Sequence, residues 1–156
     1  MAKFEITETI AQEPVRTVRL GNTGSANLYG DTEVGKPVKL TADSRYVLCA
    51  AGDEIEGVVT SVNGGTFDGY SVGGIVTKGY KQVTLDGLQA TPGTGAIAIG
   101  DYVVVGSVVA KDTALTEPMR VTKATDQAAA MAAPFKARLV AATSTAVDTV
   151  GVIEIL

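Results

Sequence analysis

The chain has 156 residues, a net charge of −4 and an apolar fraction of 46%. This length suits one domain, although two very small barrels would also fit. A protein that binds nucleic acid usually neutralises phosphates with a basic surface. Here the lysines and arginines are scattered singly along an acidic chain, so we expect no nucleic-acid partner.

Nor does the sequence suggest a membrane partner. No apolar run approaches the roughly 20 residues that a membrane helix needs. The polar start of the chain (MAKFEITETIAQEP) also lacks the apolar stretch of a secretion signal. We therefore expect a protein that is made and kept in a cytoplasm-like compartment.

The composition favours short β-strands. The 18 glycines suit tight turns, and with no tryptophan and few aromatic residues the core must be built mainly from Val, Ile, Leu and Ala. Residues 3–13 alternate loosely before Pro14, which predicts an extended N-terminal arm over 1–14 and a β-domain over 15–156. The strands that we expect, in chain order, are 14–20, 37–40, 46–50, 55–62, 70–78, 80–85, 102–109, 119–122, 136–141 and 149–156.

Several of these segments carry further expectations. The pair Gly73-Gly74 predicts a bulge or a close backbone approach, and the run 54–85 predicts a meander. Residues 102–109 are nearly all apolar, which predicts a strand buried on both faces or bent at Gly106. The alanine-rich segment 124–133 is the one candidate helix, and 149–156 is expected to close a barrel.

Together these elements predict an all-β fold. We expect a single small β-barrel or sandwich with short antiparallel strands, the extended arm and at most one short helix. The pattern Gly-Val/Ile-apolar recurs at 57–59, 74–76 and 151–153, but without a fixed period, so no repeat is predicted.

The reactive side chains are sparse. With no histidine and one cysteine, the chain lacks the parts for a Ser-His-Asp triad, a Cys-His pair or a typical zinc site. Cys49 is expected to be a small buried hydrophobe. We therefore expect no enzyme, and we assign no catalytic, cofactor-binding or metal-binding residue.

Three further patterns were weighed as sites. Residues 30–36 match most of a phosphate-binding loop, but Pro37 stands where Ser or Thr would hold magnesium, which favours a surface loop. The acidic residues of 53–56, 66–69 and 84–87 lack the density of a calcium loop, which favours solvated strand or turn positions. A local cationic face could instead dock an acidic partner, and its candidate residues are Lys36, Lys39, Arg45, Lys78 and Lys81.

Four short stretches carry a resemblance to a known family. Residues 35–40 (GKPVKL), 51–58 (AGDEIEGV), 97–103 (IAIGDYV) and 151–153 (GVI) resemble the decoration, or cement, proteins of tailed-bacteriophage heads, of the small β-barrel kind. The resemblance implies a structural virion protein on the capsid exterior, made in the host cytoplasm. Its implied partners are the major capsid protein, at junctions between hexamers and pentamers, and further copies of itself in a trimer or dimer.

Other functions stay open at this point. The chain could be another virion structural module, such as a tail-tube, fibre-base or head–tail joining protein. A sugar-binding domain is disfavoured because exposed aromatic residues are few, and an unassigned β-domain is the plainest alternative. Within the first hypothesis, residues 1–13 are expected to add a strand to the sheet edge of a neighbour.

Overall fold

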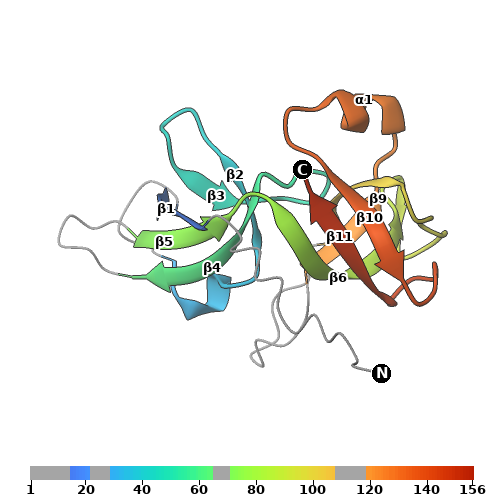
Figure 1. Cartoon of the computed structure of the whole chain (residues 1–156), viewed down its shortest axis with the longest axis horizontal. Coiled ribbons are helices and arrows are strands. Elements are labelled where there is room, and N and C mark those ends of the chain that lie inside the picture. Colours follow the sequence, from blue (N-terminus) through green and yellow to red (C-terminus); the bar gives the residue numbers. More distant parts are fainter. Residues whose placement is uncertain (1–14, 22–28, 65–70, 108–118) are drawn as a thin grey trace, which may run out of the picture.

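The all-β prediction is confirmed by a computed structural model, which describes residues 15–21, 29–64, 71–107 and 119–156 (Figure 1). The arm over 1–14 lies outside the described residues. The strands are β1 (Val15–Leu20), β2 (Pro37–Leu40), β3 (Tyr46–Leu48), β4 (Gly57–Asn63), β5 (Ser71–Val76), β6 (Gly79–Leu88), β7 (Thr91–Pro92), β8 (Tyr102–Val105), β9 (Met119–Lys123), β10 (Ala137–Ala142) and β11 (Val150–Ile155). A 3-10 turn, η2 (Asp31–Glu33), precedes β2, and the short helix α1 (Gln127–Ala132) precedes β10.

The strands form two small rings. This is the arrangement of two very small barrels that the chain length also allows. In the first ring, β1 to β5 close a barrel in the order β1-β3-β2-β4-β5. In the second ring, β6, β9, β8, β10 and β11 follow one another, and the pairing of β11 with β6 closes the circle. The short β7 adds to the outer edge of β6. Figure 1 shows the first ring at one end of the long axis and the second ring, with α1, at the other.

The two rings have the same topology. The chain order β1 to β5 corresponds to β6, β8, β9, β10 and β11, and the circular order of the first ring becomes that of the second under this correspondence. In each ring the first and third strands are parallel. All other neighbours in both rings are antiparallel.

The register repeats as well. The fourth strand bulges against the fifth directly after Val59 in the first ring and directly after Leu139 in the second. On the other side of that strand, the N–H of Val59 donates to the carbonyl of Lys36 (3.0 Å), and the N–H of Leu139 donates to that of Asp101 (2.9 Å). The chain is therefore a tandem repeat of one five-stranded ring.

The sequence did not predict this repeat because the spacing of equivalent residues is not constant. Leu20 corresponds to Leu85, since they pair with equivalent residues of the third strand, Tyr46 and Val121. By the fourth strand the separation has grown, because the second ring has a longer connection before β9 and a helix before β10. A search for a fixed period fails when the insertions fall in the connections.

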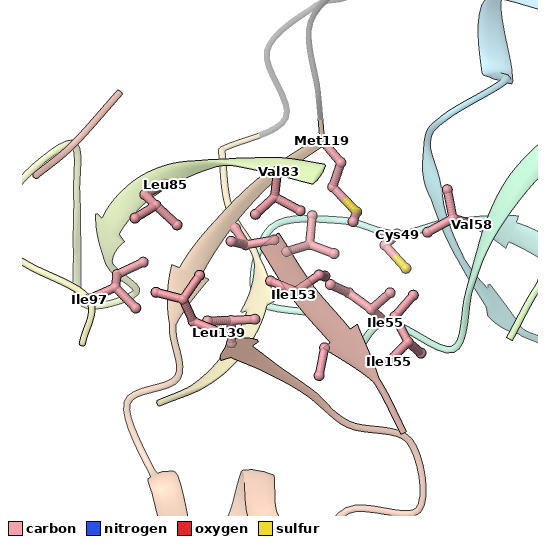
Figure 2. Close-up of a cluster of buried hydrophobic side chains, with 14 residues drawn as sticks. Cys49, Ile55, Val58, Val83, Leu85, Ile97, Met119, Leu139, Ile153 and Ile155 are labelled. Carbon is pink, nitrogen blue, oxygen red and sulfur yellow. The ribbon is translucent and has the colours of Figure 1, made fainter. Parts of the chain in front are cut away.

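A shared core joins the rings (Figure 2). The main apolar cluster lies inside the second ring, yet Cys49, Ile55 and Val58 of the first ring belong to it. Backbone hydrogen bonds also join the two rings. The N–H of Gly52 donates to the carbonyl of Val105 (2.8 Å), and the N–H of Val105 donates to the carbonyl of Asp53 (3.0 Å). The connection between β3 and β4 therefore caps the second ring.

Most local predictions hold. A Cβ on Gly73 would lie 2.2 Å from the carbonyl oxygen of Ser61, which confirms the close approach. The strand around Val104 is buried on both faces as far as Gly106, and the last strand closes its ring. The helix forms within the predicted segment, and the side chain of Asp126 caps it by accepting from the N–H groups of Ala128 and Ala129.

The meander over 54–85 is wrong beyond β5. The strands β4 and β5 pair as predicted, but β6 leaves them and pairs with β9 and β11 in the second ring. Only Thr77 and Lys78 separate β5 from β6. The alternation of both strands is the same whichever partner they take, so the pattern could not show that the chain changes rings there.

Candidate interaction surface

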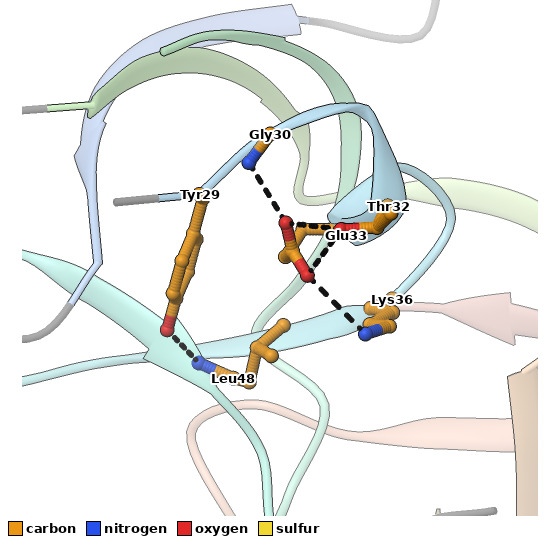
Figure 3. Close-up of polar contacts among 6 residues, drawn as sticks. All are labelled: Tyr29, Gly30, Thr32, Glu33, Lys36 and Leu48. Carbon is orange, nitrogen blue, oxygen red and sulfur yellow. Dashed lines mark hydrogen bonds and ion pairs between the residues drawn. The ribbon is translucent and has the colours of Figure 1, made fainter. Parts of the chain in front are cut away.

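The loop that resembles a phosphate-binding loop is organised around the carboxylate of one of its own residues, Glu33 (Figure 3). The carboxylate of Glu33 accepts hydrogen bonds from the N–H of Gly30 (2.8 Å) and the hydroxyl of Thr32 (2.8 Å), and it pairs with the Lys36 ammonium (3.4 Å). Partial burial raises the pKa of Glu33, but these donors outweigh it and hold the pKa below its ordinary value. The loop is at the surface, as predicted, and the carboxylate organises it.

Next to this loop, Tyr29 fixes the first ring from within. It is buried, and its phenolic oxygen accepts from the N–H of Leu48 (3.0 Å). Its backbone N–H donates to the Ser71 hydroxyl (2.8 Å), which donates in turn to the Tyr29 carbonyl (3.2 Å). Burial raises the pKa of Tyr29. This tyrosine therefore packs within the first ring.

The acidic cluster at 53–56 organises the junction between the rings. Asp53 accepts from the N–H of Ala50 (2.7 Å) and pairs with Lys39 (2.6 Å), and these contacts outweigh partial burial and lower its pKa. Glu56 accepts from the N–H of Leu40 (3.0 Å), while Glu54 is exposed. These carboxylates lie on the connection between β3 and β4, and those of Asp53 and Glu56 bind different partners. Across the described ranges, no group of three or more His, Cys, Asp and Glu residues could hold a metal ion.

Asp86 was predicted to be solvated, and that prediction is wrong. Its side chain is only 4% exposed. It accepts from the N–H (2.7 Å) and the hydroxyl of Ser107, and it pairs with Arg120 (3.3 Å). Arg120 also reaches the exposed carboxylate of Asp148 (2.6 Å). The pair Asp86-Gly87 looks like a turn in the sequence, but β6 continues through it to Leu88, which brings the carboxylate under cover.

Three of the five residues predicted for a cationic face form ion pairs. Lys36 pairs with Glu33, Lys39 with Asp53 and Arg45 with Asp43. The charges of these three residues are therefore each paired with a carboxylate on the first ring or on the connection that follows β3.

The outer wall of the second ring carries a row of polar contacts across three strands. Tyr80 on β6, Glu154 on β11 and Arg138 on β10 lie side by side in register. The Tyr80 hydroxyl donates to one Glu154 oxygen (3.3 Å), and Arg138 donates to the other through Nε (3.0 Å) and a terminal nitrogen (2.8 Å). The ring of Tyr80 is 61% exposed, so this wall offers an aromatic side chain with a fixed orientation.

Exposed apolar side chains lie at several points around the two rings. Such side chains are candidate contact points when they gather or recur on a surface. Leu40 lies at the end of β2, and Met131 and Phe135 lie on the connection that contains α1. The described large apolar residues that are exposed are Val15, Val34, Leu40, Tyr80, Ile99, Met131, Phe135, Val150 and Leu156.

Comparison with known proteins finds no relative of this chain: no family model, no curated protein and no solved structure matches it. Among the described residues, no helix is both long and apolar enough to span a bilayer. The candidate functional site is therefore the outer surface of the two rings, and its exposed side chains are the candidate contact points.

Proposed function

We propose that this chain is a structural virion protein that binds the outer surface of a bacteriophage capsid and stabilises the lattice of the major capsid protein. It acts through shape and repeated contacts, without a catalytic group, cofactor or metal. It stays on the capsid exterior and contacts coat subunits and further copies of itself. Nucleic acid and membranes are not among its partners.

The observation that carries the proposal is the tandem repeat. Two rings with the same strand order and register are joined through one apolar core. Two modules of the same architecture, held together rigidly, suit a partner that itself repeats, because contacts made by linked modules combine by avidity even when each is weak. A lattice of identical coat subunits is such a partner.

The stretches that resemble decoration proteins give further support, since they occupy related structural positions. Gly35 and Gly100 both have positive φ angles and precede the second strand of their ring. The stretch 51–58 forms the connection that joins the rings. The similar residues are therefore those that set the turns and the junction of this fold.

The experiment is a binding assay with capsid shells. The purified full chain is mixed with expanded empty heads and with unexpanded precursor shells of the major capsid protein encoded in the same genome. Both mixtures are then sedimented and imaged by electron cryomicroscopy. We expect saturable binding at fixed lattice positions on expanded heads and a higher temperature of head disruption. An unrelated small acidic protein serves as the control.

The outcomes separate this proposal from the alternative. Binding to neither kind of shell overturns the decoration function. Assembly of the chain alone into long tubes, with no shell present, would favour a tail-tube module instead. Association with purified connectors, and not with shells, would favour a head–tail joining protein.

A further inference from the structure

The tandem repeat allows one ring to be compared with the other, position by position. Val105 ends the second strand of the second ring and pairs with Val121 on the third. Leu40 ends the second strand of the first ring and pairs with Tyr46 on the third. On the first strand of each ring, Leu20 pairs with Tyr46 and Leu85 pairs with Val121. Tyr46 and Val121 are therefore equivalent, and Leu40 is the counterpart of Val105.

Val105 and Leu40 differ in how far neighbouring segments cover their side chains. Val105 is 3% exposed, because the connection between β3 and β4 of the first ring lies against it with two backbone hydrogen bonds. Leu40 is 45% exposed. The residues paired with them change in the same direction: Val121 is completely buried, whereas its counterpart Tyr46 is half-buried. The first ring therefore presents, uncovered, an end that is covered in the second ring.

The segment that does the covering also has a counterpart. The connection after β3 begins with the N–H of Cys49 donating to the carbonyl of Pro37 (3.0 Å). The connection after β9 begins in the same way, with the N–H of Ala124 donating to the carbonyl of Tyr102 (3.0 Å). In the first ring this connection places Cys49 and Ile55 in the core of the second ring.

In the second ring the corresponding connection, residues 124–136, carries α1 and two exposed apolar side chains. Met131 is 54% exposed and Phe135 is 36% exposed. The side chain of Lys136 donates to the carbonyl of Met131 (3.0 Å), which ties the end of α1 to the start of β10. Among the described residues, one molecule thus has an exposed receiving end at Leu40 and a covering connection with exposed apolar side chains at 124–136.

We propose that these two surfaces bind each other between copies of the chain. The connection 124–136 of one copy docks on the Leu40 end of the first ring of a second copy, at the position that corresponds to the junction between the rings within a molecule. The N–H of Leu40 already donates to the carboxylate of Glu56 (3.0 Å), so this contact is made through the apolar side chains and does not repeat the backbone bond that the N–H of Val105 makes. Because the two surfaces are different, the contact is heterologous, and it generates a closed ring or an open chain of copies. This inference depends on the repeat and not on capsid binding.

The test measures self-association of the full chain by sedimentation velocity from roughly micromolar to millimolar concentrations, the range of weak interfaces. We expect the wild type to associate in a concentration-dependent way. Leu40→Asp should weaken association about tenfold or more, because it places a charge in an apolar contact. The double variant M131S/F135S should weaken it similarly from the other side.

Mixing the two variants gives the decisive result. In the mixture, the L40D copy still has an intact covering connection, and the M131S/F135S copy still has an intact Leu40 end. We expect 1:1 heterodimers and nothing larger, although each variant alone stays monomeric. Ile99→Ser is the matched control: Ile99 is 62% exposed but lies on neither surface, so association should be unchanged.

Folding of every variant is checked by its thermal unfolding transition, which substitutions at exposed positions should change little. A wild type that stays monomeric at all concentrations overturns the proposal. So does a wild-type oligomer that neither variant weakens, or a mixture of folded variants that forms no heterodimer. None of these results depends on whether the chain binds a capsid.

Discussion

At the scale of single residues, Gly73 shows how tightly β1, β4 and β5 approach one another. A Cβ at this position would lie 2.2 Å from the Ser61 carbonyl oxygen and 2.5 Å from a methyl carbon of Leu20. Both neighbours are fixed, one by the backbone of β4 and the other by the core of the first ring. Glycine is required here because of space.

Gly73→Ala should therefore destabilise the protein by about 1–3 kcal/mol, the usual cost of forcing a methyl group into a filled site. Chemical denaturation of the purified variant measures this directly. Gly30→Ala is the control, since an added Cβ there meets nothing within 4 Å and the backbone is extended. Equal effects of the two substitutions would contradict the steric explanation.

The surroundings of Cys49 shift the pKa of its thiol, and this shift should have a measurable effect on the pH dependence of stability. Burial raises the pKa of its thiol from 9.0 to about 12. In the unfolded chain the thiol ionises near its ordinary pKa, while in the folded chain it stays protonated. The contribution to stability is therefore complete below pH 9 and is lost as the pH rises from about 9 towards 12.

We expect the free energy of unfolding of the wild type to fall more steeply over this alkaline range than that of Cys49→Ala. Comparison with the variant removes the effect of tyrosines and lysines that titrate in the same range. Urea denaturation at a series of pH values gives the two slopes. Parallel slopes would mean that the thiol is not protected in the folded state.

At the scale of elements, Asp86 connects parts of the second ring that are distant in the chain. Its carboxylate lies on β6 and binds Ser107, which follows β8, and Arg120, on β9. Through Arg120 it also reaches Asp148, in the turn before β11. One buried carboxylate thus ties together the strands on both sides of the parallel pair.

Removing this carboxylate leaves the partly buried Arg120 without its covered partner. We expect Asp86→Ala to destabilise the protein by about 3–5 kcal/mol, as is typical when one member of a buried ion pair is removed. Asp148→Asn removes the other carboxylate charge from the same arginine and keeps a residue type that tolerates the positive φ of this position (61°). Because Asp148 is largely exposed, the loss of this ion pair should cost about 0–1 kcal/mol. Thermal denaturation of the two variants compares them, and a reversed order would contradict the assignment.

At the scale of the whole molecule, the shared core makes the two rings one folding unit. Ile55 comes from the first ring, is 1% exposed and belongs to the apolar cluster of the second ring. A cavity at this position should be felt in both rings. The two-residue link between β5 and β6 adds to this coupling because it leaves little room for independent movement.

Ile55→Ala should lower the free energy of unfolding by about 2–5 kcal/mol in a single transition. Hydrogen exchange should accelerate together in β4 and β5 of the first ring and in β10 and β11 of the second. Ile99→Ala, at a 62% exposed position, should change little. Two separate transitions, or faster exchange in the first ring alone, would contradict the coupling.

The sequence predicts the strands of this fold better than their partners. Alternation identifies a strand such as Val150–Ile155 because one face is buried and the other is more exposed. It carries no information on which strand lies beside it, so the change of rings at Thr77–Lys78 was missed. Asp86 was missed for a similar reason: its burial depends on Ser107 and Arg120, which are remote in the chain.

The repeat has a practical consequence for mutagenesis. A substitution in one ring has a counterpart in the other with the same strand order and the same register, so most effects of local strand geometry should cancel when the pair is compared. What does not cancel is the difference in cover, as between Leu40 and Val105. Each ring can therefore serve as the reference for the other. Paired substitutions within one chain then measure the free-energy cost of leaving the end of a ring exposed to water.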